Sequence, residues 1–383
     1  MDEVIVVFDK IPTKQDGGLV ATYVDFVNEL SDVYQISFLS IFKSPETDID
    51  EFRQLEIKTL FPWNIDNYFH RAPDYLRRGK FKAFAWALVS AVLFFCCIPI
   101  ARIKTNSLLQ AKRVVAVAPA AAMFLGKRVR FLLEIHIDFE YFWGDNLLGR
   151  AQSALIPPAQ RTVFRNAIDA AKGSRLFPST YIYNTFGGSS GVVVELPEKL
   201  AHRALFVGRL VDQKNPLMLL ECAEKVRVVL PDFKLDIYGD GPLRIKLEEE
   251  IELRGLESCV RLCGFTTDKT VYRNYDLLWL TSRYEGFGLV IIEAAASMTP
   301  TVSTRWGEAV SEIIRDGETG YVVDSVDEFV EKSISLMASL DLRCEVGRNA
   351  YQDFLDRFSP EKHRQRWIDL FNETYGEVEV GHK

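Results

Sequence analysis

The sequence lacks the cysteine spacing of a metal site or of a disulfide framework. Its six cysteines form no C-x-x-C pair, most of them lie inside apolar segments, and no histidine accompanies Cys259 and Cys263. Protein zinc sites need clustered ligands, and disulfides belong to oxidising compartments. We therefore expect no metal site, and we expect the reduced, buried thiols of a cytoplasmic protein at Cys96, Cys97, Cys222, Cys259, Cys263 and Cys344.

A secretory signal and long disordered stretches are also missing from the pattern. The chain starts on an apolar, strand-like run, Val4 to Phe8, and only the tail from Gly376 to Lys383 is a candidate loose end. With 383 residues, 48% of them hydrophobic and 12% aromatic, the chain can form two α/β units with large cores.

Acidic residues are scarce between Arg71 and Arg130. This stretch has twelve basic residues against the single acid Asp74, so its net charge is +11. Because the whole chain has a net charge of −7, the remainder carries −18. Such an asymmetry indicates an anionic surface or ligand for this region alone. We expect the region 71–130 to contact an anionic membrane surface, and we expect no nucleic-acid partner.

One long apolar run, Phe84 to Ala101, has eighteen residues without a charge and is interrupted by Ser90 and Pro99. By length it could just span a bilayer, but the strands before and after it are both needed in one sheet. A buried core helix is a second interpretation. We favour a third, an interfacial segment whose surrounding cations contact anionic lipid. The expected location is then the cytoplasm, peripheral on the cytoplasmic face of the membrane.

The first half alternates strands and helices in the manner of a doubly wound parallel sheet. Strands are expected at Val4–Phe8, Gln35–Ile41, Arg113–Ala118, Val129–Ile135 and Arg175–Pro178, and helices at Leu19–Leu30, after Pro119 and over Ala151–Lys172. The pattern breaks down from Gly187 to Ala201, which is the expected linker. We therefore expect an N-terminal, Rossmann-like domain over residues 1–190 that takes the acceptor.

The alternation resumes more clearly after the linker. Strands are expected at Ala204–Val207, Lys234–Tyr238, Cys259–Cys263, Leu277–Thr281, Thr301–Ser303 and Tyr321–Val323, and helices at Pro216–Val229, Pro242–Arg254, Asp268–Arg273, Phe287–Ser297, Ala309–Arg315 and Val326–Ser339. This predicts a second Rossmann-like domain over residues 201–358 and a cleft between the two. A last helix, Ser359 to Tyr375, starts with Pro360 after an N-cap serine, in a C-terminal segment 359–383.

The stretch S-R-Y-E-G-F-G-L-V-I-I-E-A, Ser282 to Ala294, predicts a ligand site. A buried strand is expected before it and a helix over its second half. A strand, a glycine turn and a helix start direct free backbone N–H groups at one point, which suits an anion. Glu285 and Glu293 would be poor phosphate ligands, so we assign them to hydroxyls and the amides to phosphate. The combination favours a nucleotide-sugar.

Two other loops of this half follow strands and are expected at the same sheet edge. Gly208-Arg209 with Lys214 offers two cations, which would stabilise a departing nucleoside diphosphate without a metal. The loop G-D-G-P-L, Gly239 to Leu243, is half of a dinucleotide fingerprint and weak evidence for NAD. Each residue alone is typical of a solvated charge or a plain turn, and their convergence on one edge favours a functional site.

In the first half, two features could belong to a site. His136 ends an expected parallel strand, at the edge where ligands bind in open α/β sheets, and Gly17-Gly18 precedes a helix start. The alternatives are a histidine that only bonds its own loop and a plain loop turn. The glycine pair alone is weak evidence.

Three motifs resemble the hallmark motifs of family 4 of the glycosyltransferases, which are retaining enzymes of the GT-B fold. They are F-V-G-R-L…K-N-P (Phe206 to Pro216), Y-G-D-G-P-L (Tyr238 to Leu243) and the stretch from Ser282 to Ala294. Motif order and spacing agree over residues 203–325, while the first half resembles the family through Gly17-Gly18, His136 and Ser179 alone. The resemblance implies an α/β, GT-B fold whose last helix crosses back to the first domain.

The resemblance also implies roles for the matching residues. Arg209 and Lys214 would bind the donor diphosphate and neutralise the leaving group, Glu293 would take the ribose hydroxyls, and Glu285 and His136 would face the donor sugar. The other donor-binding positions would be Gly17, Gly18, Gly208, Gly239, Gly241, Pro242, Gly286, Phe287, Gly288 and Leu289. Neither a metal nor another cofactor would be needed. Departure and attack on one face would retain the configuration, with a diphosphate oxygen taking the acceptor proton.

Trp306-Gly307 departs from the family pattern, which usually has a glycine pair there, and is expected to narrow the pocket. The sequence thus predicts a hexosyltransferase-type enzyme that moves a sugar from a nucleotide-sugar, with UDP as the expected carrier, to a glycan or lipid-linked acceptor in surface polysaccharide or glycoconjugate synthesis. The alternatives are a catalytically inactive partner subunit that binds the sugar nucleotide, and a GT-B epimerase or phosphorylase. An NAD-dependent enzyme would need a complete glycine fingerprint.

Overall fold

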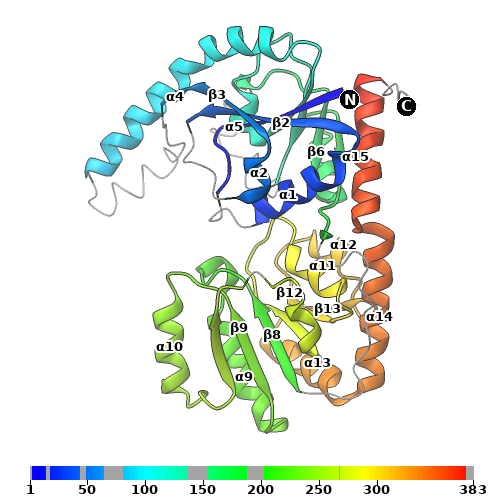
Figure 1. Cartoon of the computed structure of the whole chain (residues 1–383). Coiled ribbons are helices and arrows are strands. Elements are labelled where there is room, and N and C mark those ends of the chain that lie inside the picture. The colour runs from blue at the N-terminus through cyan, green and yellow to red at the C-terminus, as the bar shows by residue number, and fades with distance from the viewer. Residues whose placement is uncertain are drawn as a thin grey trace. The chain divides into compact units, whose positions relative to one another are not determined.

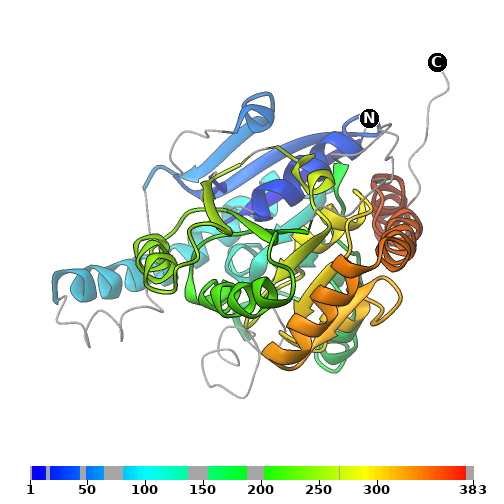
Figure 2. The same cartoon turned by 90° about the horizontal axis from the view of Figure 1, so that it is seen from below.

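The computed structural model describes residues 2–13, 18–43, 49–63, 81–136, 154–187, 202–266 and 268–376. The chain divides into two compact units (Figure 1, Figure 2). Unit 1 comprises Met1–Arg165, Asp169–Ile182 and Arg364–Lys383, and unit 2 comprises Asn166–Ile168 and Tyr183–His363. The chain therefore begins in unit 1, forms unit 2 and returns to unit 1 with its last helix.

Unit 1 is built on a parallel sheet of seven strands in the order β3-β2-β1-β4-β5-β6-β7. The strands are β1 (Asp2–Phe8), β2 (Tyr34–Phe42), β3 (Glu56–Phe61), β4 (Arg113–Val117), β5 (Leu132–Glu134), β6 (Arg161–Phe164) and β7 (Ser179–Tyr181). The strand order reverses at β1 and β4, where Val4 is paired with Arg113. This is the switch point at which open α/β sheets bind ligands.

Helices cover both faces of this sheet, which explains why its central strands are apolar from Val4 to Phe8 in β1 and from Val114 to Val117 in β4. They are α1 (Gly18–Leu30), α2 (Asp50–Arg53), α4 (Phe81–Leu108), α5 (Ala118–Ala122), α8 (Ala167–Gly173) and α15 (Pro360–Tyr375). On one face α1 and α15 share a core, in which the rings of Phe26 and Trp367 meet edge-on at 5.1 Å. On the other face α4 and α5 pack on the alternate residues of β1, Ile5 and Val7.

Helix α4 extends from Phe81 to Leu108, beyond the predicted run in both directions, and is buried along one side only. Its inner side packs in the core through Phe94, Cys97, Ile98 and Ala101. By length and composition the part Val89–Leu108 could cross a membrane, but only 33% of it is buried in the protein, so it is not a fully buried core helix. Because α4 connects β3 to β4 within one sheet, it is a crossover of unit 1, and this contradicts a transmembrane path.

Unit 2 contains a parallel sheet of six strands in the order β10-β9-β8-β11-β12-β13. The strands are β8 (Arg203–Val207), β9 (Lys234–Tyr238), β10 (Val260–Gly264), β11 (Leu277–Leu280), β12 (Thr301–Thr304) and β13 (Gly320–Val323). The helices are α9 (Leu217–Val229), α10 (Arg244–Leu253), α11 (Leu289–Ala295), α12 (Val310–Ile313), α13 (Val326–Ala338) and α14 (Leu340–Arg357), with 3-10 turns η4 (Asp212–Lys214) and η5 (Val271–Asn274).

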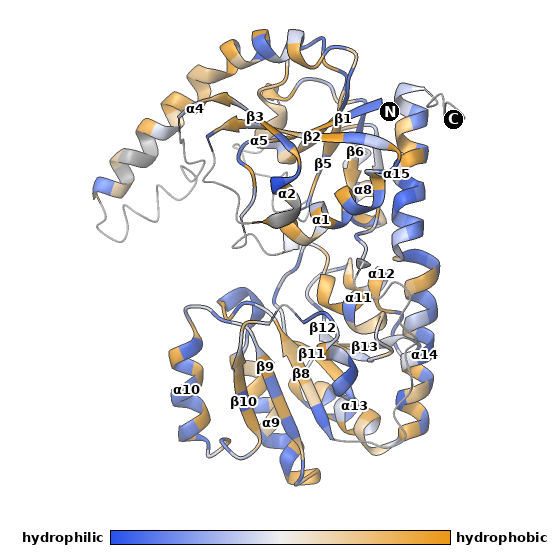
Figure 3. Ribbon diagram, viewed as in Figure 1, coloured by the Kyte–Doolittle hydropathy of each residue, from blue (hydrophilic) through white to orange (hydrophobic). Residues whose placement is uncertain are grey.

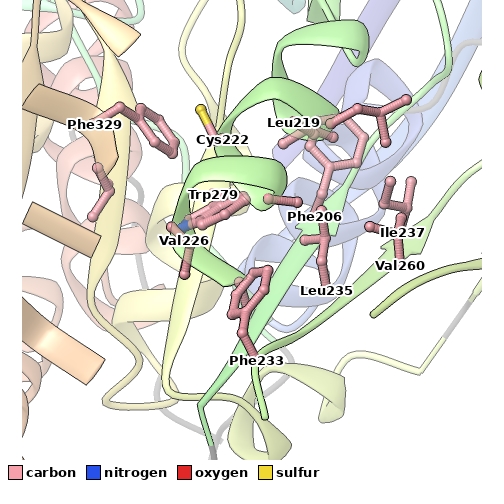
Figure 4. Close-up of a cluster of buried hydrophobic side chains, with 14 of the residues drawn as sticks. Phe206, Leu219, Cys222, Val226, Phe233, Leu235, Ile237, Val260, Trp279 and Phe329 are labelled. Carbon is pink, nitrogen blue, oxygen red and sulfur yellow. The ribbon is translucent and has the colours of Figure 1, made fainter. Parts of the chain in front are cut away.

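The core of unit 2 is centred on Trp279 of β11 (Figure 4). Its ring stacks on Phe233 and meets Phe329 edge-on, with both pairs of ring centroids 5.4 Å apart. All three side chains are fully buried. This packing holds β11 firmly in the middle of the sheet, directly before the stretch from Ser282 to Ala294.

Some predictions of local structure are wrong. A continuous helix over Ala151–Lys172 does not form, because β6 lies at Arg161–Phe164 and the helix α8 starts only at Ala167. The run Thr162 to Phe164 is β-branched and aromatic, and its pairing with β5 and β7 outweighs the helical composition around it. The strand expected at Arg175–Pro178 lies instead at Ser179–Tyr181 as β7, since residues 174–177 form turns.

Candidate functional site

The carboxyl edge of the unit 2 sheet carries the loops identified from the sequence. Residues 208–215 follow β8, 239–243 follow β9, 281–288 follow β11 and 305–309 follow β12. The strand order reverses at β8 and β11, which are neighbours in the sheet. The loops after these two strands therefore begin side by side at the switch point, where open α/β sheets bind ligands.

Lys214 and Glu285 form an ion pair between these two loops. Lys214 ends the turn η4, and its Nζ lies 2.5 Å from Glu285 Oε1, which also accepts a 2.5 Å hydrogen bond from the Ser282 hydroxyl. The hydroxyl of Thr281 donates to the Lys214 carbonyl at 3.0 Å and ties the two loops together. Only 13% of the Lys214 side chain and 8% of the Glu285 side chain are exposed. The structure thus brings together two residues that the sequence predicted separately.

Arg209 is the second residue after β8 and is exposed. In contrast to Lys214, its guanidinium group makes no hydrogen bond or ion pair with any residue that the structure describes. A cation without a protein partner costs little to bring to a ligand, because no existing contact has to be broken. Arg209 is therefore an exposed cation without a partner among the described residues, whereas Lys214 is neutralised by a carboxylate.

The turn before α11 presents backbone donors at the same edge. Gly288 has φ +83°, a conformation that favours glycine, and α11 starts at the next residue, two later than predicted. Within the described part of the chain, the N–H groups of residues 286–289 donate to no acceptor. Amide groups at such a turn suit an anion. Of the flanking side chains, Phe287 is buried and Leu289 is partly buried.

Glu293 lies on α11 and accepts a hydrogen bond from the hydroxyl of Tyr272. Burial raises the pKa of this carboxyl group, although the Tyr272 hydrogen bond and the charges of Lys269 and Lys214 oppose the rise. Lys214 is therefore near enough to act on both glutamates of the stretch. Burial and the neighbouring Glu293 also raise the pKa of the Tyr272 hydroxyl well above its usual range.

The glycines after β8 and β9 allow two loops to touch. The amide of Gly208 donates to the Tyr238 carbonyl at 3.0 Å, and the amide of Leu210 donates to the Asp240 carbonyl at 2.8 Å. A side chain at Gly239, where φ is +151°, would place its Cβ atom 1.8 Å from the Gly208 carbonyl oxygen. The packing of these loops thus requires Gly239, whatever ligand they bind. Gly241 is in a similar backbone conformation, and Pro242 is exposed.

The loop after β12 contains Trp306, which is buried against the same turn. It belongs to a cluster with Phe287 and Ile291, and the Cβ position of Gly288 lies 3.6 Å from its ring. Its indole nitrogen is buried, and within the described residues it has no hydrogen-bond partner. A large ring therefore fills space beside the Gly288 turn, in keeping with the narrowing that the sequence predicts.

In unit 1, His136 stands two residues after Glu134, the last residue of β5, and joins a buried cluster of polar side chains. Its Nε2 atom lies 3.3 Å from the Tyr23 hydroxyl, 3.3 Å from Arg165 Nη2 and 3.5 Å from Glu134 Oε2. Glu134 is fully buried, pairs with Arg165 and accepts a hydrogen bond from Tyr23. The Arg165 guanidinium can only donate to Nε2 and the Glu134 carboxylate can only accept from it, so the tautomer of the ring decides which of the two it bonds.

Burial lowers the pKa of His136 to about 3, so the ring is neutral at physiological pH. Burial also lowers the pKa of Arg165, to about 10, which leaves the guanidinium charged and able to balance Glu134. A neutral ring that is held by three neighbours can present a hydrogen-bonding nitrogen to a ligand without changing its charge.

Three residues of this cluster and one of unit 2 were not predicted: Tyr23, Glu134, Arg165 and Tyr272. A partial signal exists for Glu134, because it lies at the end of an expected strand, beside His136. None exists for Arg165, because the strand β6 that precedes it was predicted to be part of a helix. The tyrosines lie on α1 and η5, and only tertiary packing brings them to the carboxylates. Of the predicted glycine pair in unit 1, Gly18 is the exposed first residue of α1, and Gly17 lies outside the described residues.

Comparisons with known proteins find relatives of the part of the chain that forms unit 2. Residues 196–353 match the family model described as glycosyl transferases group 1. Over 169 residues the chain is 32% identical to the poly(ribitol-phosphate) alpha-N-acetylglucosaminyltransferase of Staphylococcus aureus (strain COL), covering 43% of this chain and 34% of that protein. Over 174 residues it is 34% identical to the amylovoran biosynthesis glycosyltransferase AmsD of Erwinia amylovora, covering 45% and 48%. The chain thus spans less than half the length of either relative.

Solved structures extend the likeness to both units. A TarM mutant from S. aureus, in complex with fondaparinux, alpha-GlcNAc-glycerol and UDP, superposes with a TM-score of 0.71 at 15% identity, covering 97% of this chain and 100% of that one. Anabaena Alr3699/HepE, in complex with UDP and glucose, gives a TM-score of 0.69 at 16% identity, covering 97% and 100%. These likenesses confirm the predicted fold, GT-B, with two Rossmann-like parallel-sheet units. The finer assignment to family 4 stays a prediction.

Proposed function

We propose that this chain is a retaining, metal-independent glycosyltransferase of family 4. It transfers a sugar from a nucleotide-sugar to a glycan or lipid-linked acceptor in surface polysaccharide or glycoconjugate synthesis. The observation that carries the proposal is the buried pair of Lys214 and Glu285 beside the exposed Arg209, within the segment that matches the glycosyl transferase model. Two relatives are named for transfer reactions of this kind.

The arrangement accounts for how the chain would handle a leaving nucleoside diphosphate. Arg209 meets the diphosphate without losing a contact, and Lys214 turns from Glu285 towards the added negative charge. The free amides of residues 286–289 donate to phosphate or sugar oxygens. Glu293, oriented by Tyr272, accepts from the ribose hydroxyls. Two cations and a set of amides supply the stabilisation of charge that a divalent ion supplies elsewhere.

In the proposed reaction the bond between the anomeric carbon and the diphosphate oxygen breaks, and its electron pair leaves with the diphosphate. The acceptor hydroxyl oxygen bonds to that carbon from the same face, and its proton passes to the departing diphosphate oxygen. Configuration is retained because departure and attack share one face. His136 would contact the donor sugar as a neutral hydrogen-bonding group, since its pKa of about 3 leaves it unprotonated.

UDP is the proposed carrier, supported by the UDP present in the TarM and HepE structures. A thermal-shift panel of nucleotide-sugars tests this choice, because a bound donor stabilises the folded chain in proportion to its affinity. The proposed place of action is the cytoplasm. All six cysteines are free thiols, and free thiols are typical of a reducing compartment. Cys96 is exposed and Cys263 and Cys344 are partly exposed, rather than buried as predicted.

Substitution of the two cations tests the proposal. Arg209→Ala and Lys214→Ala should each lower kcat/KM for sugar transfer roughly 100-fold, as loss of a charge-stabilising group in a reaction centre does. Lys246→Ala, at an exposed position of α10, is the matched control and should leave turnover unchanged. Circular dichroism verifies that the variants fold. Near-normal turnover in both site variants would remove Arg209 and Lys214 from the reaction.

The same assay separates the alternatives. A binding subunit without catalysis would be stabilised by the donor but would neither transfer sugar nor hydrolyse the donor when acceptor is left out. An epimerase would return an epimeric nucleotide-sugar, and a phosphorylase would require inorganic phosphate for turnover.

A further inference from the structure

Helix α4 of unit 1 is mostly apolar (Figure 3), and a row of its apolar side chains is exposed. Exposed positions recur at intervals of three and four residues, which places them along one side of the helix. They are Phe81, Ala85, Val89, Val92, Cys96, Ile100 and Ile103. Three of the bulky side chains are mostly exposed: Phe81 at 68%, Val92 at 63% and Ile103 at 74%. Single exposed apolar residues are ordinary, but a continuous row along a 28-residue helix marks an interaction surface.

The charge around this face has one sign. No acidic residue occurs between Phe81 and Leu133. The exposed cations Lys82 and Lys104 lie on α4 itself. Lys127 and Arg128 are exposed in the loop after α5, and the Arg128 amide donates to Asn106 of α4 at 3.0 Å, so this loop lies against the end of the helix. Within the described residues, none of these four cations forms an ion pair.

An exposed aromatic residue adjoins the same surface. The ring of Trp63 stacks on Phe61 with centroids 5.6 Å apart, and the ammonium group of Lys104 lies 5.1 Å from the Phe61 ring centroid. Trp63 is 56% exposed. Tryptophan is enriched where an apolar layer meets water, because its ring is apolar and its N–H group is polar.

We propose that the outer face of α4, with Lys82, Lys104, Lys127 and Arg128, docks unit 1 onto an anionic lipid bilayer. The helix lies in the membrane plane, with its apolar side chains in the interface and its cations at the lipid headgroups. At a rise of 1.5 Å per residue, α4 presents a strip about 42 Å long.

The positive charge around the α4 face favours an anionic bilayer over a second copy of the chain as its partner. A twofold dimer would place the same patch against itself, so four cations would face four cations across an apolar seam. An anionic bilayer neutralises them, and each basic residue near such a surface strengthens binding about fivefold. The lipid surface complements both the apolar face and its cations.

Vesicle flotation tests the proposal with the full chain and requires neither nucleotide-sugar nor acceptor, so its result is independent of the transfer reaction. The chain should float with vesicles that contain phosphatidylglycerol and much less with phosphatidylcholine alone. High salt should release it, because at 1 M the Debye length falls to about 3 Å.

Paired variants locate the surface. Val92→Asp with Ile103→Asp should lower the partition coefficient at least about tenfold, since two apolar side chains no longer enter the interface. Val228→Asp with Leu253→Asp changes two residues of unit 2 that are 78% and 80% exposed, and should leave binding unchanged. All four positions are solvent-exposed, and equal melting curves verify the folds.

Lys104→Glu with Arg128→Glu should weaken binding to the anionic vesicles and leave the weak binding to neutral vesicles as it is. The proposal is overturned if the unit 2 control loses binding as strongly as the α4 variant, or if anionic and neutral vesicles bind alike. It is also overturned if the chain does not bind vesicles but sediments as a dimer, and the α4 variant sediments as a monomer. The α4 face would then bind a second copy of the chain.

Discussion

At the residue scale, Glu285 neutralises Lys214 as long as the two side chains are paired. The positive charge that Lys214 presents therefore changes when a ligand contacts its ammonium group. The largely buried ammonium group of Lys214 is tolerated because Glu285 Oε1 lies 2.5 Å away. The diphosphate of the proposed donor would offer Lys214 a second, doubly charged partner. The carboxylate therefore stabilises the empty site and competes with the ligand for the same ammonium group.

This competition predicts opposite effects of Glu285→Gln on the empty and the bound protein. The variant should lose about 2 kcal/mol of stability without ligand, because Lys214 is left without its counter-charge. UDP should raise its melting temperature more than that of the original chain, since the ammonium group is no longer shared. Thermal melting with and without UDP measures both effects, and Glu249→Gln, at an exposed position of α10, is the control. An equal or smaller UDP shift in the Glu285 variant would show that Lys214 does not bind the diphosphate.

His136 predicts a pH dependence that comes from unit 1. Its folded pKa is about 3, against about 6.5 in an unfolded chain, so between these values the unfolded chain binds more protons. The unfolding free energy should therefore fall as pH falls from 6.5 towards 3, by up to about 1.4 kcal/mol per unit from this residue. The groups that face the ring are Tyr23 of α1, Glu134 of β5 and Arg165 after β6.

Urea unfolding at several pH values, compared with His136→Gln, isolates this contribution. The other titrating groups are common to both proteins, so the difference between the two unfolding free energies should shrink as the pH is lowered. Parallel curves would mean that His136 is protonated in the folded chain, and its assignment as a neutral hydrogen-bonding group would be wrong.

The sequence predicted those site residues that a local pattern marks. Arg209, Lys214 and Glu285 follow strands, and Gly288 precedes a helix, so spacing along the chain was enough to bring them to one edge. The sequence could not predict that Lys214 and Glu285 neutralise each other, because that depends on side-chain geometry across two loops. Tyr272 was missed for the same reason, as nothing in its local sequence distinguishes it from a core tyrosine.

At the element scale, the loops after β8 and β9 are locked together through glycine. The Gly239 position leaves no room for a Cβ atom, because the Gly208 carbonyl oxygen would lie 1.8 Å from it. Arg209 belongs to the β8 loop, so its position depends on that contact. Gly239, which the sequence placed in a ligand-binding loop, thus also allows the close packing that positions Arg209.

Gly239→Ala should therefore destabilise unit 2 and misplace Arg209. We expect a loss of about 3 kcal/mol, since the backbone of two loops must shift and the φ of +151° is strained for alanine. Gly255→Ala is the control, because Gly255 has a positive φ of +58° and open space around its Cβ position, and its cost should stay near 1 kcal/mol. Chemical denaturation of both variants measures the difference, and equal losses would show that strain alone, not the loop contact, requires Gly239.

Elements were predictable where burial made them apolar. The strands β4 and β11 are buried throughout and β1 is buried from Val4 to Phe8, so continuous apolar runs marked them. The edge strand β3 was missed because its residues Glu56 to Phe61 are mostly exposed or partly exposed and include Lys58. Helix α14 was missed as well, since its mixed polar composition gives a weak periodic signal.

At the scale of the whole molecule, each hydrophobic cluster of the described residues lies within one unit, and α15 gives the C-terminal segment to unit 1. Trp367 is fully buried against Phe26 of α1 and Phe371 of its own helix. Phe233 is equally buried against Trp279 in the core of unit 2. Neither core includes a residue of the other unit. Units with independent cores can unfold in separate steps.

This division predicts two calorimetric transitions that respond to different changes. Trp367→Ala should lower the transition temperature of unit 1 alone, and Phe233→Ala that of unit 2 alone. Each variant should lose about 4 kcal/mol of unfolding free energy, the usual cost of removing a buried aromatic side chain. UDP should raise the temperature of the transition that Phe233→Ala lowers, because the residues proposed to bind the diphosphate all lie in unit 2. A single transition that both variants lower equally would mean that the units unfold as one body. A UDP effect confined to the transition lowered by Trp367→Ala would move the diphosphate site to unit 1, away from Arg209 and Lys214.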